Sequence, residues 1–95
     1  MENFNWGKFH DWVIGQIIVD WTAGKVSISL RFETEAHIKF DKFKIVSIPR
    51  HLPWGMSLYV NSIKCEKVSD NWKLDIELQS GDIINIVGEQ LELNE

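Results

Sequence analysis

The sequence has 95 residues, a hydrophobic content of 44% and a formal net charge of −4 at neutral pH. A chain of this length is sufficient for one core, so we expect residues 1–95 to form a single domain. Five tryptophans and five phenylalanines supply the apolar surface that disordered chains lack. The acidic balance argues against a general nucleic-acid-binding protein, because such proteins use a basic surface to displace phosphate counterions.

Neither a disulfide nor membrane insertion is expected. Cys65 is the single cysteine, which excludes an internal disulfide and a multi-cysteine zinc site. It shares the parity of Ile63 in a predicted strand, which favours a packing role over a nucleophilic one. The first residues lack the pattern of a signal peptide, and no apolar window is long enough to span a bilayer. These features predict a cytoplasmic protein.

The first half of the chain has the pattern of a hairpin followed by a bent strand. Residues 12–21 are rich in β-branched and aromatic side chains, and residues 25–33 alternate strictly between apolar and polar. Gly24 lies in the turn between them, where a positive φ is easily adopted. A third strand is expected over residues 36–48, and a change in apolar parity near residues 41–42 predicts a bulge or bend there.

The second half repeats the pattern. Residues 56–68 predict a strand with a parity change between Val60 and Ile63, and residues 72–79 alternate without interruption. A tight turn then leads into IINIV, after which Gly88 is expected to end the strand, so that QLELN adds a last short one.

These segments predict a mainly β protein. We expect six or seven antiparallel strands in a curved meander, as a small sandwich or a half-barrel, with room for one short helix within residues 4–11. The order of the strands is left open.

His10 and Asp11 are adjacent ionisable residues near the start of the chain. Consecutive residues of a strand point to opposite faces, so the pair is not expected to bind one metal ion. We expect Asp11 to accept hydrogen bonds in a turn and His10 to donate one to a carbonyl. The remaining histidines and carboxylates show no spacing typical of a metal, cofactor or catalytic site, so an enzyme is not expected.

Both faces of the first predicted strand are apolar, and either another part of the chain or a partner must cover the second face. One face carries Val13, Ile17, Val19 and Trp21, and the other carries Trp12, Ile14 and Ile18.

The sequence contains three elements that together resemble the small immunity proteins of bacterial polymorphic-toxin and contact-dependent inhibition systems. They are the FHD-x-x-I-x-x-I segment from Phe9 to Ile17, the PWG of residues 53–55, and the closing LDIELQSGDIINI hairpin. The resemblance implies a monomeric or dimeric protein that binds a cognate toxin, and it assigns no contact residues.

An acidic, compact protein without a catalytic cluster agrees with such a role. We expect it to occlude the active site of its toxin partner, for example a basic nuclease site, with fast electrostatically steered association. The exposed carboxylates and aromatic anchors expected to contact the partner are Trp12, Trp54, Asp70, Asp75 and Glu77.

Two alternatives remain open. The first is a homo-oligomeric structural or adaptor domain that uses the apolar second face of residues 12–21. The second is an OB-like module in which Phe40 and Phe43, flanked by lysines, stack on single-stranded nucleic acid or another ligand.

Overall fold

The protein folds as a single open sheet of six antiparallel strands, preceded by one short 3-10 turn. The computed structural model describes residues 3–51 and 58–95. The mainly β fold and the short N-terminal helical turn are therefore confirmed. No helix within these ranges is long and apolar enough to cross a membrane. In chain order the elements are η1 Trp6–Phe9, β1 Val13–Asp20, β2 Lys25–Arg31, β3 Glu35–Ser47, β4 Val60–Val68, β5 Asn71–Leu78 and β6 Ile83–Asn94.

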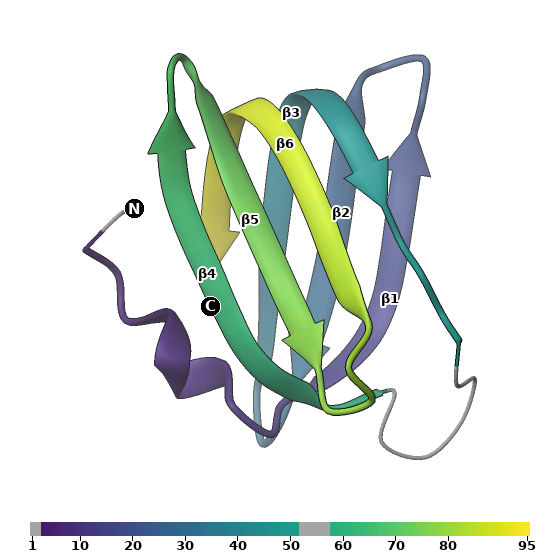
Figure 1. Cartoon of the computed structure of the whole chain (residues 1–95), viewed down its shortest axis with the longest axis vertical. Coiled ribbons are helices and arrows are strands. Elements are labelled where there is room, and N and C mark those ends of the chain that lie inside the picture. Colours follow the sequence, from purple (N-terminus) through teal and green to yellow (C-terminus); the bar gives the residue numbers. More distant parts are fainter. Residues whose placement is uncertain (1–2, 52–57) are drawn as a thin grey trace.

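The order of the strands, which the sequence left open, is β1-β2-β3-β6-β5-β4. Two three-stranded meanders are thus joined through the pairing of the long strands β3 and β6. The sheet curves around its own core like a half-barrel (Figure 1). Where β1 and β4 begin, the two edges meet: the Asp11 amide donates to the Val60 carbonyl, and the Val60 amide to the Trp12 carbonyl, each at 2.8 Å.

Beyond the point where β1 and β4 meet, the turn η1 lies beside β4 and packs against the open side of the curved sheet. Trp6 and Phe9 are buried, and the ring of Phe9 meets that of Trp12 edge-on at 4.8 Å between centroids. The aromatic N-terminal segment therefore belongs to the core.

The inner face of the sheet supplies the rest of the core. Alternation in β2 and β5 places every second residue inside, as their sequence pattern predicts. The buried apolar residues of the strands are Val26, Ile28, Leu30, Ala36, Ile38, Phe40, Val60, Ile63, Leu74, Ile76, Leu78, Ile84 and Ile86.

Both predicted irregularities are present. In β3, Lys42 has a φ of 55°, and the register with β6 shifts between Phe43 and Ile45. In β4, the register with β5 shifts between Val60 and Ser62, leaving Asn61 as the extra residue. After the bulges Phe43 and Ile63 again face the core, which is the physical meaning of the parity changes, whereas Ile45 stays on the outer face.

Gly88 does not end a strand, contrary to the sequence-based expectation, and β6 runs through it to Asn94. A Cβ at this position would lie 2.9 Å from Cδ1 of Phe40 and 3.2 Å from the Phe43 Cα. The glycine therefore permits a close approach between β6 and the bend of β3, and this role leaves the strand unbroken.

Candidate interaction surface

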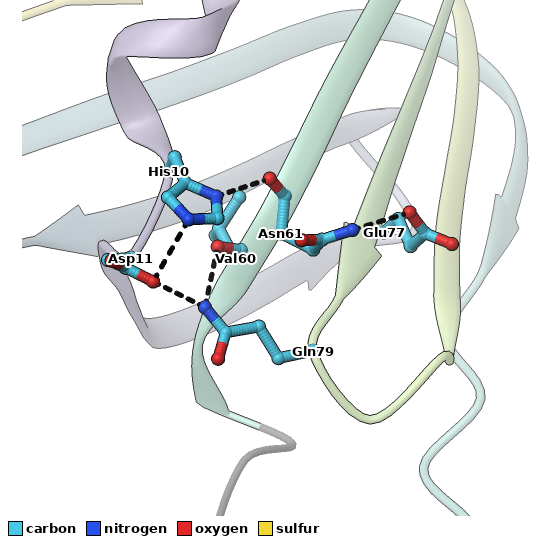
Figure 2. Close-up of polar contacts among 6 residues, drawn as sticks. All are labelled: His10, Asp11, Val60, Asn61, Glu77 and Gln79. Atoms are coloured by element: carbon cyan, nitrogen blue, oxygen red, sulfur yellow. Dashed lines mark hydrogen bonds and ion pairs between the residues drawn. The ribbon is translucent and has the colours of Figure 1, made fainter.

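His10 and Asp11 lie in the turn after η1 and not in a strand, so the expectation that they point to opposite faces is wrong. Asp11 has a φ of 70°, which turns the chain and brings its carboxylate to 3.4 Å from Nε2 of His10. Nδ1 of His10 donates to the Asn61 carbonyl at 2.8 Å, as expected for a histidine that satisfies a nearby backbone oxygen (Figure 2). The Asp11 carboxylate accepts a hydrogen bond from the Gln79 side chain.

Asn61, the extra residue of the β4 bulge, connects this turn to β5. Its carbonyl accepts from His10, and its Nδ2 donates to Oε1 of Glu77 at 2.9 Å. Nε2 of Gln79 bridges the Asp11 carboxylate and, at 3.5 Å, the Val60 carbonyl. Figure 2 shows how these contacts join three segments that are distant in sequence. We call His10, Asp11, Asn61, Glu77 and Gln79 the polar junction.

The polar junction is a structural bridge and lacks the geometry of a catalytic site. A general base needs a free nitrogen near a nucleophile, whereas one ring nitrogen of His10 faces a carbonyl and the other faces the Asp11 carboxylate. The nearby Ser62 hydroxyl donates to Glu77, at 3.3 Å, and not to the imidazole. Across residues 3–51 and 58–95, no group of three or more His, Cys, Asp or Glu residues is placed to hold a metal ion.

Asp75 and Glu77 lie together on the outer face of β5, where they alternate with buried Leu74, Ile76 and Leu78. Each carboxylate is held by neighbouring strands. Asp75 accepts a hydrogen bond from the Asn85 side chain, and Glu77 accepts two, from Asn61 and from Ser62. These bonds fix the carboxylates in defined positions while leaving them partly exposed.

Exposed apolar side chains lie on the same outer face: Ile83 directly beside Glu77, and Ile45 and Val87 in the row that continues to Lys73 of β5. Ile83 stands opposite Glu77 in the sheet and is 46% exposed, and Ile45, opposite the half-buried Val87, is 51% exposed. We call Asp75, Glu77, Ile45, Ile83 and Val87 the outer patch. The apolar residues of this patch were not predicted from the sequence. The segment IINIV nevertheless has apolar residues at both odd and even positions, which indicates a strand with an apolar side chain on its exposed face.

The other residues expected to contact a partner lie elsewhere. Trp12 is half-buried and packs against Phe9 and, at 6.3 Å between stacked rings, Phe32. Asp70 is exposed in the β4–β5 turn, at the opposite end of β5 from Glu77. Trp54 falls outside the described residues. Of the four expected contact residues that the structure describes, the fold therefore brings together two, Asp75 and Glu77.

The β3 aromatics do not form a stacking platform. Phe40 is only 2% exposed and belongs to the core, while the half-buried Phe43 meets the Trp21 ring edge-on at 5.7 Å. Lys44 lies 3.6 Å from the Glu89 carboxylate. The centre proposed for nucleic-acid or ligand stacking is thus occupied by packing within the fold.

A hollow of about 520 Å³ lies on the sheet surface formed by β1, β2, β3 and β6. In one row of paired residues, Lys25 stands between Asp20 and Asp41; two rows further along the sheet, Lys39 stands opposite Glu92. Alternating charges of this kind largely neutralise one another, so the hollow favours neither an anionic nor a cationic ligand.

A second polar cluster fastens the β5–β6 turn to the segment after β3. The carboxylate of buried Asp82 accepts hydrogen bonds from the His51 amide at 3.1 Å and from the Ser80 hydroxyl at 3.2 Å, and it also contacts the His51 ring. The His51 contact, chiefly, holds the pKa of Asp82 below its ordinary value.

Half-buried Cys65 packs against the core.

No protein-family model matches this sequence, and no curated protein matches it either. Among solved structures, the chain is similar to the crystal structure of an uncharacterized protein from Neisseria gonorrhoeae, with a TM-score of 0.75 and 16% sequence identity. The alignment covers 92% of this chain and 93% of that chain. At this identity the likeness establishes a shared fold and nothing about activity.

Proposed function

We propose that this protein is an immunity protein that binds a cognate toxin domain through the outer patch and thereby blocks the toxin's active site. The observation that carries the proposal is the placement of two carboxylates, held by hydrogen bonds from neighbouring strands, beside exposed apolar side chains. This combination suits a protein partner whose surface is basic around an apolar centre.

Preorganisation supports a binding role for the carboxylates. Asp75 and Glu77 are already hydrogen-bonded within the sheet, so a partner need not order two mobile side chains when it docks. A partner arginine or lysine adds donors to oxygens that still have free acceptor capacity. The net charge of −4 accelerates encounter with a basic surface.

The apolar residues supply the other half of the interface. Ile45 and Ile83 are each about half exposed and lie on rigid, paired strands. Burial of such side chains by a partner contributes roughly 25 cal/mol per Å² of apolar surface removed from water. Residues of this kind, surrounded by charges, typically form the centre of an interface.

The first test is whether the reading frame upstream of this gene ends in a toxin-like C-terminal domain, and the second uses that domain as the binding partner. Co-expression with the full chain is expected to rescue growth, and the purified pair to form a complex measurable by calorimetry. Ile45→Ala should weaken binding by about 5- to 30-fold, the range of a moderate interface residue.

Val68→Ala is the matched control, because Val68 is 50% exposed at the end of β4, away from the outer patch. Asp70→Asn is the matched control for Glu77→Gln, because it also neutralises one carboxylate but lies at the opposite end of β5. Complex formation that is indifferent to Ile45→Ala and Glu77→Gln would exclude the outer patch as the binding surface. Failure of the chain both to bind the toxin domain and to rescue growth would refute the immunity function itself.

A further inference from the structure

The strand β1 forms one edge of the sheet and is paired on its outer side only where it begins. The Trp12 carbonyl accepts from the Val60 amide, and Val13 forms a single bridge to Tyr59. Within the described residues, no pairing continues along this edge. An unpaired edge offers a row of backbone donors and acceptors to another strand.

The second half of β1 also exposes apolar side chains. Ile18 is 52% exposed and Val19 41%, while Trp21, directly after the strand, is 81% exposed. The first half is less available, because Ile14 and Ile17 line an apolar cavity of about 280 Å³ whose other side includes Ile48 and Pro49. The exposed apolar side chains of this edge are therefore concentrated from Ile18 to Trp21.

The two edges of the sheet differ sharply in protection. On β4, Lys64, Glu66 and Lys67 are exposed, and η1 packs alongside. Charged side chains and a covering element are the usual means by which proteins prevent edge-to-edge association. In contrast, β1 has no charged residue from Val13 to Val19.

We infer that β1 is the interface of a symmetric dimer, in which a second copy of this chain pairs antiparallel with it across a twofold axis. An axis that passes between the two copies at Ile18 places the two Ile18 residues opposite each other, places Val19 of each copy opposite Ile17 of the other, and extends one sheet through both copies. Apolar side chains then face apolar side chains along the shared edge.

The charge pattern favours a second copy over an unrelated strand. In this register Asp20 lies opposite Gln16 of the second copy, so the two Asp20 carboxylates sit at opposite ends of the paired segment. Each Asp20 also has Lys25 of its own chain directly across the hairpin. Two chains of net charge −4 can therefore approach along this edge without opposing carboxylates.

Sedimentation velocity on the full chain tests the inference. A short strand pair gives a small interface, so a concentration-dependent shift from monomer to dimer is expected between about 5 and 200 µM chain. Val19→Lys places two ammonium groups close to the axis and should weaken dimerisation at least tenfold. Val68→Lys, at a similarly exposed position on the other edge, should leave dimerisation unchanged.

Ile18→Asp is a second disrupting variant, and circular dichroism verifies the fold of each protein. A wild-type chain that remains monomeric at the highest concentration would overturn the inference, and so would a dimer that survives both β1 variants. Capture of an unrelated strand by a monomeric chain would likewise overturn it. The test requires no toxin, so its outcome is independent of the proposed function.

Discussion

Replacement of Gly88 by alanine tests the close approach that allows β6 to cross the bend of β3. The added methyl group would lie 2.9 Å from Cδ1 of Phe40, 3.2 Å from the Phe43 Cα and 3.4 Å from the Lys42 carbonyl oxygen. The Phe40 ring is 2% exposed, so it cannot swing into solvent, and the other two atoms belong to the backbone of β3. The clash must therefore be relieved by separating the two strands or by repacking the core.

Overpacking of this kind costs about 1–3 kcal/mol. For a domain of this size, that loss corresponds to a decrease in Tm of roughly 4–8 °C per kcal/mol. The β3–β6 pairing joins the two meanders, so a local separation here weakens the connection between both halves of the sheet. We expect the variant to fold with a free energy of unfolding lowered by this amount.

Equilibrium urea unfolding, followed by the fluorescence of the five tryptophans, provides the measurement. Gly15→Ala is the control, because its Cβ would meet chiefly the Ser29 hydroxyl, at 2.8 Å, which can rotate away. Its effect should remain within about 0.5 kcal/mol, as for ordinary surface substitutions. Equal stability of Gly88→Ala and wild type, with an unchanged m-value, would refute the argument from close approach.

Three further predictions concern the burial of Phe9, the stability of the protein at acidic pH and the reactivity of Cys65. Phe9→Ala should lower the free energy of unfolding by about 3–5 kcal/mol, because the side chain is fully buried, whereas Phe32→Ala, at 64% exposure, should cost far less in the same urea titration. The folded-state pKa of Asp82 lies below its ordinary value of 3.8, so its contribution to stability is present above that pH and is lost as the pH falls through the folded pKa. Asp82→Asn should therefore reduce the loss of unfolding free energy on acidification below about pH 4. Equal slopes of the unfolding free energy against pH for the two proteins would contradict this. Cys65, half-buried against the core, should react with a thiol reagent more slowly in the native protein than in urea, and equal rates would exclude the packing role.

Local patterns in the sequence predicted most of the individual elements. Strict alternation identified β2 and β5 because one face of each strand is buried. Changes in apolar parity located the bends at Lys42 and Asn61, since an extra residue is the only way for a strand to return its apolar side chains to the core. These features depend on neighbouring residues in the chain.

The errors arose where long-range contacts determine the role of a residue. Gly88 has the composition of a strand end, but Phe40 from another strand explains why glycine is required within β6. Asp11 accepts a hydrogen bond in a turn, as expected, but His10 and Asp11 do not point to opposite faces, because the positive φ of Asp11 and the bulge at Asn61 together create the polar junction. The contact of Gly88 with Phe40 and that of His10 with Asn61 join residues far apart in the chain, so neither can be identified from residues adjacent in sequence.

The amino-acid sequence alone determined that this chain is mainly β and acidic, with two bent strands, because hydrophobic periodicity and net charge are local or additive properties. Only the tertiary structure decided that β3 pairs with β6, that Ile83 lies beside Glu77, and that β1 is an edge strand without a charged residue from Val13 to Val19. Strand order and shared surfaces result from pairings between residues far apart in the chain, and these are selected by the packing of the whole core.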